Sequence, residues 1–248
     1  MGLGGALEVE KEVWKLTIIC DDRIRRYAQV RLFFGAALST FDTATDMYMI
    51  YEFYEAGAAN YARATIYSLV ANVVYQLLWV WFQNRKKKKK GKMLREMAFV
   101  LCFVKPGVDV WRVASDTEEE EGSLVDPKLE MMFTKGGELL CEAIPGTLIQ
   151  MYAYLQGGDR SNAAAFSLIV SVFTAAFTSA GVSFDFDVRK DPREIEPSFF
   201  GYVPDGTKGK VWMFFLLFVM SATQLFTKAF ACALCALSNR GGDSSLAS

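Results

Sequence analysis

The chain has 248 residues, of which 52% are hydrophobic and 14% aromatic, and its mean hydropathy is +0.17. Its 27 basic and 28 acidic residues nearly cancel, so the overall charge gives no indication of a nucleic-acid partner. Histidine is absent, which excludes His-based acid–base catalysis, Ser-His-Asp triads and His-ligated metals.

The hydrophobic residues are gathered into runs of about 20 that alternate with charged blocks, which is typical of polytopic α-helical membrane proteins. We therefore predict an all-α fold, a polytopic transmembrane helical bundle with about five spans plus a re-entrant or half helix. One transmembrane domain is expected over residues 32–237. A basic N-terminal segment, interfacial or cytosolic, precedes it at 1–31, and a disordered tail follows at 238–248.

The first half of the chain begins with a charged segment at residues 8–31, expected to be an interfacial helix or a tail. Residues 32–54 are predicted to form the first span and residues 62–82 the second. The basic loop RKKKKKGK follows the second span, and the positive-inside rule places such loops on the cytosolic side. Because two spans separate the basic N-terminus from this loop, the N-terminus is expected to be cytosolic too.

The next apolar stretch, residues 97–104, is too short to span a membrane and predicts a re-entrant or half helix. A cytosolic linker is expected over about 105–127, and a helix over 128–155 with a charged first half and an apolar second half. Residues 163–182 predict a span, about 183–210 a cytosolic loop, and 211–237 the last apolar stretch. Whether this last stretch crosses once or turns back is left open, and with it the side of the C-terminus.

Each long apolar segment carries one polar face. The first span contains Asp42 and Asp46, which lie about 40° apart on a helix because they are four residues apart. An acid at the centre of a membrane helix costs roughly 2.5–3.5 kcal/mol on insertion scales, so such acids usually face other helices, water or a substrate path. The predicted polar interior comprises Asp42, Asp46, Asn72, Gln76, Glu138, Glu142, Gln150, Gln224 and Lys228.

Within this set, Lys228 is expected to pair with Asp42, Asp46 or Glu142, because a buried cation attracts buried carboxylates. Pro145 is expected to kink its helix beside Glu142, since its ring removes one helical hydrogen bond. The hydroxyl stripe at residues 167–178 is interpreted as contacts that hold helices together.

The basic loop is also a candidate contact with anionic lipids, at about 1 kcal/mol per basic residue near the membrane surface. Its residues are Arg85, Lys86, Lys87, Lys88, Lys89, Lys90 and Lys92.

Two motifs give the chain a family resemblance. The stretch FDTATDMYMIYEFYEAG, which contains Asp42 and Asp46, is similar to the opening of the XK-related membrane proteins. The helix ELLCEAIPGTLIQMYAYL resembles a Glu-Ala-x-Pro-Gln helix of that family, with Gly146 in place of its glutamine. The resemblance covers roughly residues 30–155. It implies a phospholipid scramblase whose intramembrane charges, here Asp42, Asp46 and Glu142, line a path for lipid head groups.

The leading hypothesis is therefore an integral protein of the plasma membrane or an endomembrane that moves phospholipids passively between leaflets through a polar groove. An ion or proton channel or transporter, and a non-catalytic accessory subunit, remain as alternatives. No P-loop, metal cluster or nucleophile elbow is present, so we expect no enzyme, cofactor or metal. The expected partners are membrane phospholipids, with an accessory membrane protein or a second copy of the chain as further possibilities.

Overall fold

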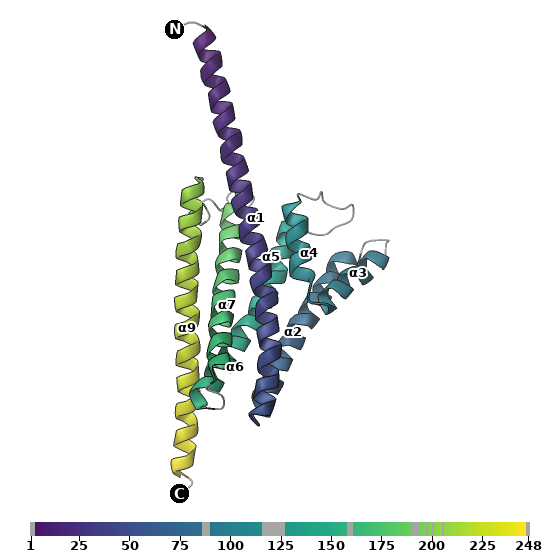
Figure 1. Ribbon diagram of the computed structural model, residues 1–248, viewed down its shortest axis with the longest axis vertical. Coiled ribbons are helices and arrows are strands. Elements are labelled where there is room, and N and C mark those ends of the chain that lie inside the picture. Colours follow the sequence, from purple (N-terminus) through teal and green to yellow (C-terminus); the bar gives the residue numbers. More distant parts are fainter. Residues whose placement is uncertain are drawn as a thin grey trace.

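Figure 1 shows the computed structural model as a bundle of helices, with no strand among the residues that it describes. These are residues 3–85, 90–115, 127–157, 161–189, 194–196, 198, 199, 201–204 and 206–246. Side chains are described from residue 25 to residue 238 within these ranges, except at Lys90, Lys92 and Pro127. For this part of the chain the predicted all-α fold is confirmed.

The N-terminal helix α1, Leu3–Glu55, is a single helix of 53 residues whose first part extends beyond the bundle (Figure 1). No break marks the boundary expected at residue 31, because neither proline nor glycine occurs between residues 6 and 34. The chain then turns at Gly57, which has a positive φ of 70°, a backbone conformation that favours glycine. Helix α2, Ala59–Asn84, packs against α1.

Two short helices follow, α3 at Lys90–Leu101 and α4 at Lys105–Ala114. The expectation that the linker begins at residue 105 is wrong, because residues 105–114 are helical and pack against α1 and α5. Pro106 lies in the first turn of α4, where its fixed φ suits a helix start and its missing N–H is not needed. Residues 116–126 of the expected linker lie outside the described residues.

The helix expected at 128–155 is observed in three consecutive parts: α5 at Pro127–Glu138, the π-helical turn η1 at Leu139–Ala143, and α6 at Ile144–Gln156. The interruption expected at Pro145 therefore takes the form of a π-helical turn just before the proline. Helix α6 ends at Gly157, whose φ of 80° closes the helix with a left-handed cap.

Helix α7, Asn162–Val188, starts at Ser161, whose side chain accepts a hydrogen bond from the Ala164 N–H at 3.1 Å. It continues six residues into the expected loop. The last helix, α9, covers Thr207–Leu246 and so includes most of the tail that was expected to be disordered. Elongation of an existing helix needs only one further hydrogen bond per residue, and no proline follows Pro204 to stop it.

Three helices in the described part of the chain are long and apolar enough to cross a membrane: α2, α7 and residues Thr207–Ser238 of α9. The other two expected spans, 32–54 and 128–155, lie in α1 and in α5–η1–α6, which pack between these three helices. Buried acids lower the mean hydropathy of the first of these segments, and the π-helical turn divides the second into helices of 12 and 13 residues, each too short to cross a membrane alone. Helix α9 runs along one edge of the bundle, beside α7 (Figure 1).

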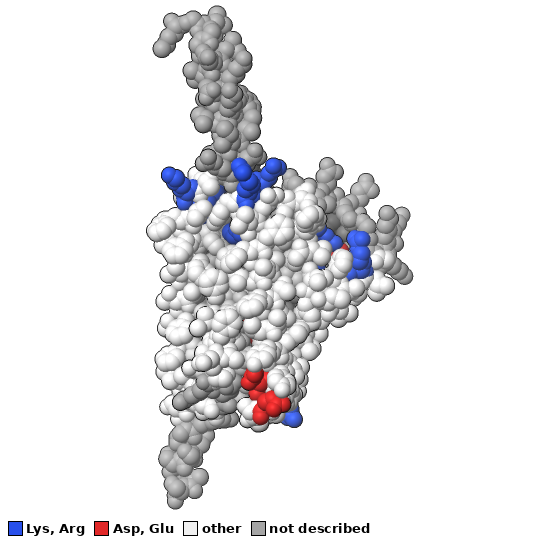
Figure 2. Space-filling model, viewed as in Figure 1, with Lys and Arg blue, Asp and Glu red and all other residues white. Residues whose placement is uncertain are grey.

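The bundle has a polar middle between apolar ends. One apolar cluster joins Met49 and Phe53 of α1 to Ala62, Ala153 and Ala164. Others near the opposite end join Leu32 and Ala36 to Val110 and Met131, and Ala180 and Phe184 to Val203 and Phe214. Figure 2 shows basic side chains gathered towards the end with the N-terminus, while acidic side chains cluster at the opposite end. The two ends of this face of the bundle thus differ in charge.

Candidate functional site: a buried carboxylate layer

Asp42 and Asp46 lie in the polar middle of the bundle, on the part of α1 between its two apolar clusters. Their residues are only 3% and 2% exposed. Asp42 accepts a hydrogen bond from Ser171 of α7, with 2.8 Å between Oγ and Oδ1. Gln150 of α6 donates its Nε2 hydrogen to Asp46 Oδ1 at 2.7 Å. Both acids therefore point into the bundle and reach polar residues of other helices.

Glu138 and Glu142 complete what we call the carboxylate layer, the set Asp42, Asp46, Glu138 and Glu142. Glu138 is the last residue of α5 and Glu142 lies within the π-helical turn, and they are 7% and 3% exposed. Ser39 of α1 donates a hydrogen bond to Glu138. Glu142 accepts one from Thr43 Oγ1 at 2.9 Å and another from the Asn72 amide of α2.

Pro145 explains how α2 meets the π-helical turn. Because proline has no N–H, the Cys141 carbonyl loses its usual donor four residues later. The Ser68 hydroxyl of α2 supplies the missing donor at 2.7 Å. One turn further along α2, Gln76 Nε2 donates to Asn72 Oδ1 at 3.1 Å, which orients Asn72 towards Glu142. The predicted residues Asn72, Gln76, Glu142 and Gln150 are thus brought together with the two aspartates.

The carboxylate layer is bonded by neutral donors. Among the side chains that the structure describes, the hydrogen bonds to its four acids come from serine, threonine, asparagine and glutamine. No lysine or arginine of the described part lies within 4 Å of their oxygens as an ion pair. Lys135 of α5 interacts electrostatically with Glu138 but forms no ion pair with it within 4 Å. A buried acid without a cation in direct contact is costly to keep charged, and such acids in membrane proteins usually mark a path or a binding site.

A small cavity of about 20 Å³ lies beside Glu138 and Glu142. This volume is enough for about one water molecule. The turn between α3 and α4 covers it with Phe103, whose φ of 57° is unusual for a residue with a large side chain. The short helical pair α3–α4 therefore places its turn directly over the carboxylate layer.

The predictions for Gln224 and Lys228 are wrong, because both side chains are exposed on the outer face of α9. Helix α9 packs through Ala229 and Ala233, which are each 3% exposed. At about 100° per residue, Lys228 lies about 100° away from Ala229 on the helix surface, and Gln224 lies about 140° away. Lys228 is therefore no partner of Asp42, Asp46 or Glu142.

The basic loop is only partly described. Arg85 is exposed, and its guanidinium lies 4.6 Å from the centre of the Phe82 ring. Lys86, Lys87, Lys88 and Lys89 lie outside the described residues, as do the side chains of Lys90 and Lys92, whose backbone belongs to α3. The predicted contact with anionic lipids stays a prediction.

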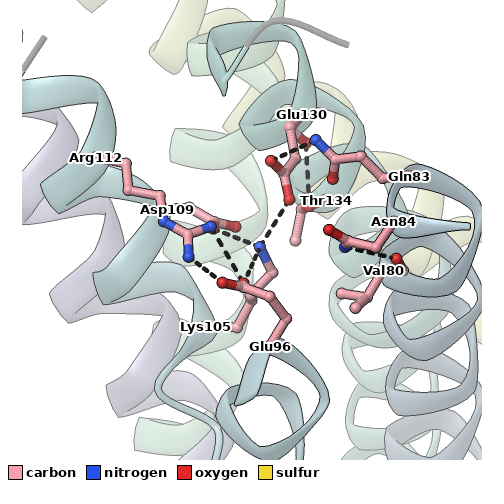
Figure 3. A network of polar contacts seen from close by, with 9 residues as sticks. All are labelled: Val80, Gln83, Asn84, Glu96, Lys105, Asp109, Arg112, Glu130 and Thr134. Atoms are coloured by element: carbon pink, nitrogen blue, oxygen red, sulfur yellow. Dashed lines mark hydrogen bonds and ion pairs between the residues drawn. The ribbon is translucent and has the colours of Figure 1, made fainter. Parts of the chain in front are cut away.

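A second buried polar cluster, which the sequence analysis missed, joins α3, α4 and α5. We call it the ion-pair network and define it as Glu96, Lys105, Asp109, Arg112 and Glu130 (Figure 3). Lys105 is 1% exposed, and its ammonium contacts Asp109, Glu130 Oε1 at 2.9 Å and Glu96 Oε2 at 3.6 Å. Arg112 binds Glu96 through two nitrogens. The Lys105–Asp109 spacing of four residues was the available sequence signal.

Neighbouring charges and burial shift the pKa values in this network, which lies in helices too short to span a membrane. Burial raises the pKa of Asp109 to about 6, although Lys105 opposes the shift. Burial alone would raise the pKa of Glu96, but hydrogen bonds from Arg112 and the charges of Lys105 and Arg112 outweigh it and lower that pKa. Gln83 of α2 donates to Glu130 at 2.7 Å, so the network also ties α2 to α5.

Comparison with known proteins agrees with the motifs around Asp42 and Glu142. The family described as XK-related protein matches residues 30–186, which is more than half of the chain and includes all four acids of the carboxylate layer. No curated protein and no solved structure matches the chain. With the family match and three apolar helices long enough to cross a membrane, the chain belongs to the XK-related family of membrane proteins.

Proposed function

We propose that this protein lets phospholipids pass between the two leaflets of a membrane along a polar path through the carboxylate layer. The observation that carries the proposal is the set of four buried acids on α1, α5 and η1 that are bonded by neutral donors alone. The head groups of the common phospholipids carry an ammonium group. Its attraction to a carboxylate is strong where water is scarce, so these acids would stabilise a head group at membrane depth.

Passage requires that the path be wider than the cavity beside Glu138 and Glu142, whose volume of about 20 Å³ is too small for a head group. In our proposal the structure represents the closed form, and the α3–α4 turn moves away from α1 and α2 when the path opens. The turn is a suitable moving part because Phe103 has a strained backbone and because α3 and α4 are short.

The proposed orientation places the end that carries the N-terminus and most exposed basic residues in the cytosol. This follows from the positive-inside rule applied to Arg25, Arg26 and Arg85, which are exposed, and to the basic loop. In this arrangement α1 and α5–η1–α6 cross the membrane beside the three apolar helices, giving five crossings. The plasma membrane and the endomembranes are both compatible with it.

Reconstitution of the full chain into liposomes tests the proposal. A fluorescent phospholipid is incorporated in both leaflets, and dithionite then bleaches the label that reaches the outer leaflet. Empty vesicles should retain the label of their inner leaflet, whereas vesicles with the protein should lose it without nucleotide or an ion gradient. Equal bleaching of empty and protein-containing vesicles would contradict lipid transfer.

Cation or proton conduction is the second candidate, favoured by the fact that the cavity beside the acids is sized for water. The same vesicles, loaded with a pH-sensitive dye and given a potassium gradient, distinguish it: conduction without loss of inner-leaflet label would support a channel. The accessory-subunit alternative has less support, since the polar stripes of α2, α6 and α7 contact α1 and η1 within the chain. In all these cases the protein transports or binds and is not an enzyme.

A further inference from the structure

A second cavity, of about 440 Å³, lies at the basic end of the bundle, away from the carboxylate layer. It is bounded by α1, α4, α5, α7 and α9, and much of its wall is apolar, including Leu32, Met131, Met132, Phe184 and Val188. Its volume falls within the range of roughly 300–1,000 Å³ that is usual for pockets that bind small molecules. Nothing in the proposed lipid path uses it.

The charged residues around this cavity are mostly cations. Arg31, Lys128, Arg189 and Lys210 line it together with a single carboxylate, that of Asp185, so the lining residues carry positive charge in excess. These residues come from four different helices, α1, α5, α7 and α9, and from the residue that follows α7. Cations that converge from separate elements on one cavity are the arrangement that recognises an anionic group.

Arg31 is the residue that gives this cavity a fixed anion-binding group. It is 8% exposed, pairs with Asp185, and lies over the rings of Phe184 and Phe214 at 4.8 and 5.2 Å. Its Nε is buried and has no hydrogen-bond partner among the described residues. A guanidinium held in place with one donor unused is suited to bind a phosphate oxygen, because its planar donors match phosphate geometry.

The geometry points to a binding site for the phosphate of an anionic phospholipid, with the glycerol and first acyl carbons against the apolar wall. A soluble phosphate compound would use the cations alone and make no use of the apolar side of the cavity, which Met131, Met132 and Phe184 line. The exposed arginines at the same end, Arg25 and Arg26, attract the anionic lipid surface that supplies such a ligand. The site lies apart from the carboxylate layer and does not depend on lipid transfer.

The test is native mass spectrometry of the full chain in detergent, titrated with dioleoyl phosphatidic acid. The variant Lys210→Met removes a cation at the cavity, and Lys208→Met is its matched control, two residues earlier on α9 and exposed. Lys210→Met should weaken lipid binding by about tenfold, as expected for the loss of one charge-assisted phosphate contact. Lys208→Met should bind like the wild type.

A third variant, Met132→Trp, fills the cavity without changing its charge and should prevent binding. Equal affinity of wild type, Lys210→Met and Met132→Trp would overturn the site, as would an equal loss in Lys210→Met and Lys208→Met. Glycerol 3-phosphate serves as the soluble probe. If it displaced the lipid at the lipid's own concentration, the assignment to a phospholipid would be wrong, whereas failure to displace it supports the role of the apolar wall.

Discussion

The carboxylate layer and the ion-pair network are both buried and both rich in acids, but they differ in what balances the acids. In the network, Lys105 and Arg112 contact Glu96, Asp109 and Glu130 directly. In the layer, the hydrogen bonds come from neutral groups such as Ser171, Gln150 and Asn72. The two clusters are adjacent, because α3 and α4 carry all members of the network except Glu130. The turn between these two helices contacts the cavity beside Glu138 and Glu142.

This difference separates structural charge from charge that is available to a ligand. An ion pair in the interior is intact only while both partners remain, and removal of one leaves an uncompensated charge. An acid bonded by hydroxyls and amides can be replaced by its amide with few lost contacts, so its charge is not needed for folding. We therefore expect changes in the network to affect stability and changes in the layer to affect transport.

The largest effect on stability is expected for Lys105→Met. The substitution removes the ammonium that contacts three buried acids, and breaking a buried pair in this way costs about 3–5 kcal/mol. The thermal midpoint in detergent, or the yield of monodisperse protein if the variant barely folds, measures the loss. Lys208→Met, the same substitution at an exposed site, should remain within about 0.5 kcal/mol of wild type. Equal stability of both variants would show that the network does not hold α3 and α4 in place.

The double variant Asp42→Asn with Asp46→Asn should lower lipid transfer while it leaves stability unchanged, in contrast to Lys105→Met. The amides keep bonding capacity towards Ser171 and Gln150, so expression and thermal stability should be preserved. Lipid transfer in the dithionite assay should fall about tenfold or more, which corresponds to about 1.4 kcal/mol of lost stabilisation along the path. Glu55→Gln, an exposed acid on the same helix, is the matched control and should transfer lipid normally. Unchanged transfer with improved stability would mean that the two acids have no transport role.

The sequence was sufficient to predict most of the layer because its residues recur at helical spacing within apolar runs. Asp42 and Asp46 lie on one face for that reason, and Glu142 and Gln150 lie on another. Periodicity predicts which residues share a face, but not which face is buried. Helix α9 is apolar on nearly every side, so the packing of Ala229 and Ala233 determines which face is buried. Gln224 and Lys228 therefore lie on the outer face.

The ion-pair network was not predicted because its members are far apart in the sequence and occur in segments that resemble linkers. Glu96, Asp109 and Glu130 acquire a common partner only when α3, α4 and α5 pack together. Arg31 was assigned to a basic N-terminal segment for the same reason, since its partner Asp185 is 154 residues away. Long-range pairing of charges depends on tertiary structure, which local patterns do not contain.

A change in the turn that connects the two clusters should have a smaller effect on lipid transfer, and it should raise transfer instead of lowering it. Phe103 has a left-handed backbone that costs roughly 1–2 kcal/mol for a residue with a side chain, so Phe103→Gly should recover strain while it loses ring contacts. Stability should change by less than about 1 kcal/mol, because the two effects oppose each other. Removal of the ring widens the cavity beside Glu138, so lipid transfer should rise about two- to fivefold, or by roughly 0.4–1 kcal/mol.

The control for this variant is Phe103→Leu, which keeps an apolar side chain over the cavity and the strained backbone, and should transfer lipid close to the wild-type rate. Slower transfer in Phe103→Gly at unchanged stability would show that the turn supports the path and does not close it.

The pH dependence of stability isolates Asp109 within the network, with an effect as small as that of the turn. Its pKa of about 6 lies above the ordinary aspartate value of 3.8, chiefly because it is buried. The folded protein therefore binds this proton more tightly than the unfolded chain, and the resulting stabilisation is full below pH 3.8 and is lost as the pH rises to about 6.

Glu96 acts in the opposite sense, because its lowered pKa gives stability that is present above its ordinary value of 4.5 and lost as the pH falls. Within the network only the Asp109 contribution should change from pH 5 to pH 7, and acids elsewhere in the chain are the same in both proteins, so the wild type should lose more stability over this interval than Asp109→Asn does. We expect a difference of about 2–4 °C in the shift of the thermal midpoint, which corresponds to about 1 kcal/mol for a chain of this size. Parallel curves for the two proteins would show that Asp109 stays ionised over the whole interval, which would mean that Lys105 compensates its burial completely.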